Sequence, residues 1–124
     1  MTQESIQTRY TLAPALASAT ELEQAIARAI EANKQDFFPL LDRLVDVGDS
    51  RVKLSQKDPL RVLGVELDEA RTGGTARLSY ESNFSESCRL IDEYDQHQTS
   101  VAFTLNGDQL VFDLELPIEW NFDN

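Results

Sequence analysis

Cysteine and histidine are scarce in this sequence of 124 residues, which contains one of each, Cys88 and His97. A single cysteine excludes an internal disulfide and any zinc site built from several thiolates, so folding needs no oxidising compartment. His97 stands in the acidic segment DEYDQHQ, but its spacing from the carboxylates matches no metal or acid–base motif. We therefore predict no metal site, and we expect His97 to lie in a solvated polar loop.

Recognisable catalytic motifs are also missing. Cys88 has one neighbouring cation, Arg89, in a segment rich in carboxylates, and this setting favours the unreactive thiol. We expect Cys88 to be a small apolar side chain of the core. No serine stands in a G-x-S-x-G setting, and Gly73-Gly74 lacks the strand-to-helix context of a phosphate loop, so we expect a hairpin turn there. The sequence predicts no catalytic residue and no cofactor.

Basic residues are half as frequent as acidic ones: 11 Lys and Arg stand against 22 Asp and Glu, which gives a net charge of −11. Residues 61–124 carry thirteen carboxylates and four basic side chains, net −9, whereas residues 1–60 carry nine and seven, net −2. This charge repels free nucleic acid and anionic membrane surfaces, and it favours a basic protein as the partner.

Long apolar runs are absent as well. No run approaches the roughly 18 residues of a membrane span, and the N-terminal segment lacks the basic-then-apolar order of a signal peptide. We expect a soluble cytoplasmic protein. Because 41% of its residues are hydrophobic, the chain can bury one modest core, so residues 1–124 are predicted to form a single domain.

Helical periodicity is confined to about residues 15–48. Thr20 with Glu23 three positions later is the pattern of a capped helix start, and Ser18 with Glu21 is a second candidate. The helix that follows has one apolar stripe on an otherwise polar surface. This stripe consists of Leu22, Ala25, Ile26, Ala29 and Ile30.

A second helix is predicted in the segment DFFPLLDRLVDVG. Asp36 can cap it, Pro39 falls in the first turn where a missing N–H does little harm, and Gly48 can end it in the left-handed conformation. We expect the two helices to form a helical hairpin. The buried face of the second helix is predicted to contain Phe37, Leu40, Leu41, Leu44 and Val45.

Apolar residues alternate with polar ones after about residue 60, as they do in strands. The first predicted hairpin places two apolar sets on one face, so the numbers of opposed residues must sum to an odd value. We place this sum at 145, which opposes Leu67 to Leu78 and Val65 to Tyr80. The two sets are Leu63, Val65 and Leu67 and, after the turn, Ala76, Leu78 and Tyr80.

A second hairpin is predicted around Asn106-Gly107, the preferred pair for a type I′ turn. Residues 83–97, between the hairpins, fit either a helix or a strand, and we favour a strand because it would continue the flanking ones. Residues 48–59 are the expected linker between helices and sheet. The second hairpin is predicted to oppose Phe103 to Leu110 and Val101 to Phe112, with all four on one face.

These elements predict an α+β fold. An N-terminal helical pair, about residues 15–48, packs on a mostly antiparallel, meander-like sheet of about four to six strands, about residues 60–118, and residues 117–124 form a short acidic aromatic tail. The order of two helices followed by a curved antiparallel sheet loosely resembles small cone-shaped folds such as the NTF2-like family. This resemblance implies a pocket between helices and sheet, although the chain departs from the family in lacking a clear third helix.

Carboxylates are dense on the predicted sheet, and many project opposite to the apolar residues, towards solvent. They form either a solvated surface or a binding face for a basic protein. Trp120 and Phe122 in the tail either fold back over the core or act as an interface hot spot inside an acidic rim. The candidate partner-binding residues are Glu66, Asp68, Asp92, Glu93, Tyr94, Asp95, Asp113, Glu115, Glu119, Trp120 and Phe122.

Three functions are compatible with these features, and one of them, an assembly or chaperone-like subunit that dimerises through the sheet, cannot be separated by sequence from the one we favour. The one we favour is a non-enzymatic acidic protein-binding module, most concretely an inhibitor or immunity-type protein that blocks a basic, nucleic-acid-handling partner. The alternative is a cone-shaped ligand-binding or enzymatic domain whose pocket uses Tyr80, Tyr94, His97 or a buried carboxylate. The sequence predicts no oligomeric state.

Overall fold

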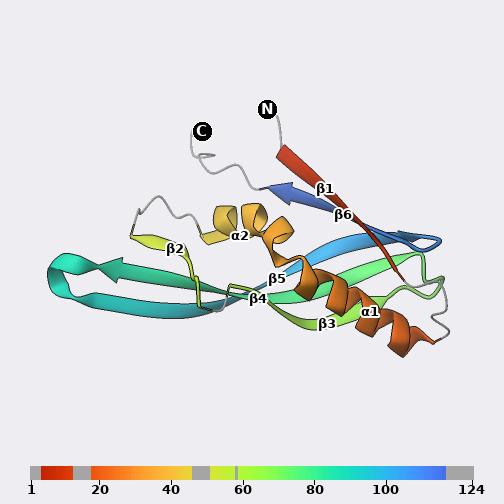
Figure 1. Cartoon of the computed structure of the whole chain (residues 1–124), viewed down its shortest axis with the longest axis horizontal. Coiled ribbons are helices and arrows are strands. Elements are labelled where there is room, and N and C mark those ends of the chain that lie inside the picture. The colour runs from red at the N-terminus through yellow and green to blue at the C-terminus, as the bar shows by residue number, and fades with distance from the viewer. Residues whose placement is uncertain (1–3, 13–17, 46–50, 58, 117–124) are drawn as a thin grey trace.

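Two helices cover one face of a six-stranded antiparallel sheet that curls into a half-barrel (Figure 1). The computed structural model describes residues 4–12, 18–45, 51–57 and 59–116. This architecture confirms the predicted α+β class. In chain order the elements are β1 (Glu4–Thr11), α1 (Ala19–Ala32), the 3₁₀ helix η1 (Lys34–Phe37), α2 (Phe38–Val45), β2 (Val52–Leu54), β3 (Arg61–Leu67), β4 (Gly73–Glu86), the 3₁₀ helix η2 (Ser87–Arg89), β5 (Ile91–Asn106) and β6 (Gln109–Leu116).

Helix α1 begins at the second of the two predicted caps. The Ser18 side chain accepts a hydrogen bond from the backbone N–H of Glu21, and the Glu21 carboxylate accepts one from the Ser18 backbone in return. The preferred prediction, Thr20, is wrong because Thr20 already lies in the first helical turn. Ile26 and Ile30 of the predicted apolar stripe are fully buried, which confirms the face of the helix that meets the core.

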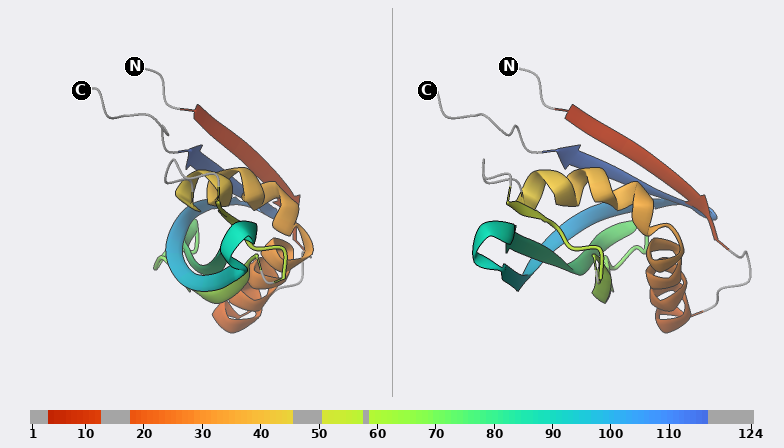
Figure 2. Two further views of the ribbon diagram at one scale, coloured as in Figure 1. Left: turned by 90° about the vertical axis from the view of Figure 1, so that its left-hand side faces the viewer. Right: turned by 60° about the vertical axis from the view of Figure 1, so that its left-hand side comes forward.

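The two helices meet at a bend and do not fold back on one another (Figure 2). The predicted helical hairpin is wrong because η1 joins α1 directly to α2 and leaves no loop for a chain reversal. Asp36 lies inside η1 and does not cap α2, whereas Pro39 occupies the first turn as predicted. Gly48 lies outside the described residues. The predicted buried face is confirmed, with Phe37, Leu40, Leu41 and Val45 buried and Leu44 partly buried.

The sheet is built on one long hairpin. Strands β4 and β5 pair from Gly73 opposite Thr104 to Glu86 opposite Ile91, so residues 83–97 are strand on both sides of the short η2 tip. This confirms the strand interpretation of that segment. The strand order is β1-β6-β5-β4-β2, and β3 also pairs with β4. Because β2 lies inside the predicted linker, residues 48–59 are not merely a connection.

The register of β3 against β4 differs from the prediction. Val65 lies opposite Ala76, a sum of 141, so the odd sum is confirmed but the value of 145 is wrong. A bulge between Val62 and Gly64 then shifts the register by one, and it leaves Leu63 42% exposed although we expected it on the apolar face.

The turn of this hairpin lies before the two glycines. The Asp68 carboxylate accepts a hydrogen bond of 2.9 Å from the backbone N–H of Thr72, which closes the turn over residues 68–72. Gly73 and Gly74 are therefore the first residues of β4 and not the predicted turn. A Cβ atom on Gly74 would collide with the backbone carbonyl oxygen of Glu66, so close approach of the two strands is what requires glycine there.

The register of the last hairpin also differs from the predicted one, by two residues. Phe103 lies opposite Phe112, so the predicted pairs are wrong and the turn is centred on Gly107 and Asp108. Gly107 has φ of 67°, as at the first central position of a type II′ turn, and the Asp108 carbonyl accepts a hydrogen bond of 2.7 Å from Leu12. A shift by two keeps every side chain on its predicted face. Accordingly Val101, Phe103, Leu110 and Phe112 are all buried.

Strand β1 was not expected in the sheet. It pairs with β6 along the whole of both strands, from Glu4 opposite Leu116 to Thr11 opposite Gln109. Within the described residues, neither helix is long and apolar enough to cross a membrane. The core fills the space between the helices and the inner face of the sheet, the face that the helices cover. Its fully buried side chains include Ile26, Ile30, Phe37, Leu41, Leu60, Leu78, Leu110 and Phe112.

Candidate protein-binding surface

The sheet divides between β5 and β6. The two strands pair only over Phe103–Asn106 and Gln109–Phe112, and beyond this point β6 continues with β1 while β5 continues with β4. We call this division the fork. Among the described residues, residues 91–102 of β5 consequently have a strand partner on one side only. Figure 1 shows this part of β5 running out past the helices together with the part of β4 that pairs with it. We call these paired segments, residues 75–86 of β4 and 91–102 of β5, the arm.

The open side of β5 presents backbone groups that pair with no other strand among the described residues. Leu105 donates its N–H to the Thr72 carbonyl at 2.8 Å, so the odd-numbered residues of β5 bond to β4. In an antiparallel pair the intervening residues point their N–H and C=O groups the other way. The residues that face the open side are Asp92, Tyr94, Gln96, Gln98, Ser100 and Ala102, and all six have exposed side chains.

The strands that line the fork are acidic. Residues 91–102 of β5 and 113–116 of β6 contain five carboxylates and neither lysine nor arginine. We call these two segments the fork strands. All five carboxylates are exposed, and the alternation of apolar and polar residues predicted this for Asp113. They are Asp92, Glu93, Asp95, Asp113 and Glu115.

Side-chain hydrogen bonds hold the outer face of the arm, the face away from the helices. Asn83 donates to the Asp92 carboxylate at 2.7 Å, and Gln96 donates to the Glu81 carboxylate at 2.7 Å. Each of these bonds crosses from β4 to β5, so the two strands keep a fixed relative position well beyond the reach of β6. The Lys57 ammonium lies 4.5 Å from the centre of the Tyr94 ring.

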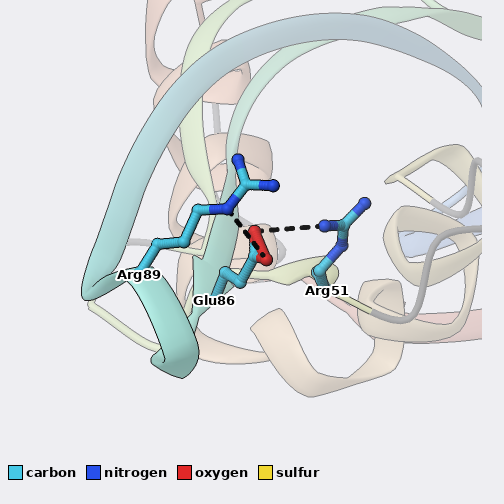
Figure 3. Close-up of polar contacts among 3 residues, drawn as sticks. All are labelled: Arg51, Glu86 and Arg89. Atoms are coloured by element: carbon cyan, nitrogen blue, oxygen red, sulfur yellow. Dashed lines mark hydrogen bonds and ion pairs between the residues drawn. The ribbon is translucent and has the colours of Figure 1, made fainter.

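Basic side chains near the arm lie on the side of β2, at the tip, and in β4, where Arg77 is opposite Ser100 and its guanidinium lies against Gly64 of β3. Arg51 and Arg89 both contact the Glu86 carboxylate, at 3.1 Å and 3.6 Å (Figure 3). Arg51 also lies over the Phe84 ring, 5.0 Å from its centre. The two guanidinium groups thus balance the charge of Glu86 locally.

Two hollows lie at the fork and share Ala102, Asp113 and Glu115. The larger, about 270 Å³, is bounded by Leu40 and Leu44 of α2 on the inner side of the sheet. The smaller, about 180 Å³, is also lined by Thr104 and Val111. A chain that enters the fork would therefore meet apolar side chains on one face and carboxylates on the other.

The predicted partner-binding residues divide into separate groups. Glu66 of β3 lies opposite Thr75 of β4, and Thr75 lies opposite Ala102 of β5. Ala102 and Asp113 line the same hollow, so Glu66 and the carboxylates of β6 share one end of the outer face. Asp92 is about 33 Å from Ala102 along β5, ten residues at about 3.3 Å each. Asp68 is engaged in the turn of the first hairpin. Glu119, Trp120 and Phe122 lie outside the described residues.

His97 lies in β5 and not in a loop, so that prediction is wrong. Its Nε2 atom is 2.7 Å from the Ser82 hydroxyl, and its ring stacks on Tyr80 with centroids 5.1 Å apart. Ser82 is only 5% exposed. A serine next to a histidine is the start of a nucleophilic site, but a substrate has no access to a hydroxyl buried in this way. The contacts with Ser82 and Tyr80 instead hold the His97 ring in place on the sheet.

Cys88 is exposed, which contradicts its predicted place in the core. The prediction assumed that the strand alternation continued through this residue. The β4–β5 pairing ends at Glu86, so Cys88 falls in the η2 tip.

A separate groove of about 420 Å³ lies between α2 and the residues after β2. It is lined by Phe38, Leu54 and Pro59 together with Asp42. Burial raises the pKa of the Asp42 carboxyl above its ordinary value. The sequence pattern marked Asp42 only as a polar position of the second helix, because its environment depends on a distant strand.

Within the part of the chain that the structure describes, no three His, Cys, Asp or Glu side chains come together to hold a metal ion. Comparison of the chain with protein-family models, curated proteins and solved structures finds no match in any of the three.

Proposed function

We propose that this protein is a non-enzymatic acidic binding module for a basic protein, and that the fork strands are its binding surface. The observation that carries the proposal is the charge of these strands, which hold five exposed carboxylates and no lysine or arginine. Ordered, solvent-facing charges of one sign raise the rate of encounter with a partner of the opposite sign and disfavour the wrong partners.

The most concrete form of this function is inhibition of a nucleic-acid-handling protein. Such a partner has a basic surface shaped for phosphates, and carboxylates on a rigid strand can occupy the same positive surface. The cross-strand bonds from Asn83 and Gln96 support this role because they hold the arm in one conformation before binding. An immunity-type or anti-defence protein would act in this way.

A ligand-binding domain is the second candidate, and the groove beside Asp42 favours it. A carboxyl with a raised pKa among apolar side chains is a common element of such sites. However, Asp42 has no second acid or base among the residues that line the groove, and its side chain is exposed. We therefore place protein binding first.

The experiment is affinity capture from the native host's lysate at moderate salt with three forms of the full chain. The arm variant is Asp92→Asn/Glu93→Gln/Asp95→Asn. The control variant removes three charges elsewhere. It is Glu23→Gln/Glu69→Gln/Asp108→Asn, at exposed or half-exposed positions of α1 and two turns.

We expect one basic protein to be retained by the wild type and the control variant and lost by the arm variant. The purified partner should then bind more weakly as the salt concentration rises, because exposed charges are screened. Equal capture by all three forms would contradict the proposal, and so would the absence of any basic protein specific to the wild type.

A further inference from the structure

We infer that the partner engages the fork by adding a β-strand to the open side of β5, and that this strand is an extended segment with alternating basic and apolar side chains. The inference rests on the proposed function and specifies how the same surface binds. Binding by charge alone would not involve the backbone, whereas strand addition requires the backbone N–H and C=O groups of residues 92–102.

The backbone of β5 is prepared for such an addition. Six alternate residues from Asp92 to Ala102 direct both N–H and C=O towards a side on which no described residue pairs with them. The bonds of the odd-numbered residues to β4 hold this row in one continuous register, without a bulge. An exposed strand edge of this length is a template for a further strand, and strand addition is a common mode of peptide recognition.

The two faces of the fork determine the chemistry of the added strand. On the inner side Leu40 and Leu44 border the larger hollow, where an apolar side chain would be buried. On the outer side Asp113 and Glu115 border both hollows, where lysine or arginine would meet carboxylates. Successive residues of a strand point to opposite faces, so one basic–apolar alternation satisfies both sides where the larger hollow lies, beside residues 99–102 of β5.

A second copy of this chain is a poorer occupant. If two β5 edges paired, two chains of net charge −11 would have to meet, and neither edge has a lysine or arginine to pair with the carboxylates of the other. Charges on an edge strand commonly prevent this kind of self-association. The same charges attract a basic strand.

The test uses the ¹⁵N-labelled full chain and a decapeptide of alternating lysine and valine. Amide hydrogen exchange is measured residue by residue, with and without the peptide, at moderate salt. We expect the exchange of the even-numbered amides from Asp92 to Ala102 to slow by about tenfold or more in the complex, because only these amides gain a hydrogen bond. The odd-numbered amides, already bonded to β4, should change little.

Two matched controls separate backbone pairing from charge. A decapeptide of alternating N-methyl-lysine and valine has the same charge but lacks the lysine N–H groups, which face β5 in an antiparallel pair when the lysines lie on the outer side, and we expect it to give no alternating protection. On the protein side, Gln98→Pro removes one outward-facing N–H without breaking a bond to β4, whereas Gln98→Thr keeps it. Gln98→Pro should weaken binding of the lysine–valine peptide at least about tenfold relative to Gln98→Thr.

Several outcomes would overturn the inference. If the lysine–valine peptide binds but the even-numbered amides are not protected, the acidic surface binds the peptide without adding a strand. The proposed function would then still stand. Absence of peptide binding also overturns strand addition, while capture of a folded basic protein tests the function independently. Protection that appears without peptide as the protein concentration rises would show that a second copy is the occupant. The two peptides decide the matter even if Gln98→Pro does not fold.

Discussion

The Tyr10 hydroxyl donates a hydrogen bond to the Asp36 carboxylate at 2.8 Å, and this bond joins β1 to the 3₁₀ turn between the helices. Burial raises the pKa of Tyr10 to about 12, and Asp36 adds to the shift because its carboxylate accepts the phenolic proton. The Tyr10 ring also meets the edge of Phe112 in the core, with centroids 6.2 Å apart. This contact holds the outermost strand of the sheet against the helical layer.

Replacing Tyr10 with phenylalanine keeps the ring contact and removes the hydrogen bond. We expect Tyr10→Phe to lower the free energy of unfolding by about 1 kcal/mol, the usual net contribution of such a bond. A double-mutant cycle with Asp36→Ala, followed by urea unfolding, measures the coupling between the two side chains. Strictly additive losses would show that the bond contributes nothing.

Gly74 provides a steric test of the β3–β4 pairing. We expect Gly74→Ala to destabilise the fold by about 3 kcal/mol, because a methyl group there would collide with the Glu66 carbonyl. Gly107→Asn is the matched control. At Gly107 no atom lies within 4 Å of the added Cβ, and asparagine tolerates the positive φ, so the loss should stay below about 1 kcal/mol. Similar losses in the two variants, measured by thermal unfolding, would contradict this pairing.

The register of the last hairpin can be tested by cross-linking. In the structure Thr104 lies opposite Val111, whereas the sequence-based register places Thr104 opposite Gln109. In a Cys88→Ser background, the pair Thr104→Cys/Val111→Cys should form an intramolecular disulfide under mild oxidation, because paired strand positions have the required Cα separation. The pair Thr104→Cys/Gln109→Cys should form it much more slowly. The reverse order of rates would support the type I′ register.

Asp42 gives a pH prediction with a definite sign. Its pKa is raised in the folded state, so the folded chain binds this proton more strongly than the unfolded chain does. The contribution of Asp42 to stability therefore falls as the pH rises from the ordinary carboxyl value, about 3.9, through the folded pKa.

Asp42→Asn removes this loss. Relative to the wild type, the variant should gain stability between about pH 3 and pH 7, by no more than about 0.5 kcal/mol because the side chain is still exposed. Urea unfolding of both proteins at the two pH values measures the difference. A relative stability that does not depend on pH would show that burial of Asp42 is unimportant.

Side-chain faces were predictable from the sequence, but registers were not. The period of two in apolar residues fixes only whether opposed positions sum to an odd or even number, and both hairpins obey it next to their turns, the first one as far as the bulge after Val62. The actual register depends on contacts from elsewhere in the chain. Leu12 bonds to the Asp108 carbonyl and Gly74 packs against Glu66, and neither contact is visible in a local pattern.

The candidate site was predictable to a similar extent. The exposure of Asp113 and Glu115 follows from alternation within β6. The fork does not, because it arises where β6 leaves β5 to pair with β1, and β1 has too few apolar residues to be recognised as a strand by itself. Asp92 was predicted to bind a partner because of its charge. That its backbone points to the open side of β5 follows from the register of β5 against β4, which the sequence did not predict.

The most direct test of the central claim is the affinity of a fluorescent lysine–valine decapeptide for the wild type, the arm variant and the control variant at one salt concentration. We expect the arm variant to bind about tenfold more weakly, since the three carboxylates that it loses lie along the bound strand, and about 0.5 kcal/mol of attraction for each amounts to roughly that factor. The control variant, with the same net charge, should stay within about twofold of the wild type. Equal weakening of the two variants would contradict the account, because net charge alone, and not the fork strands, would then explain the binding.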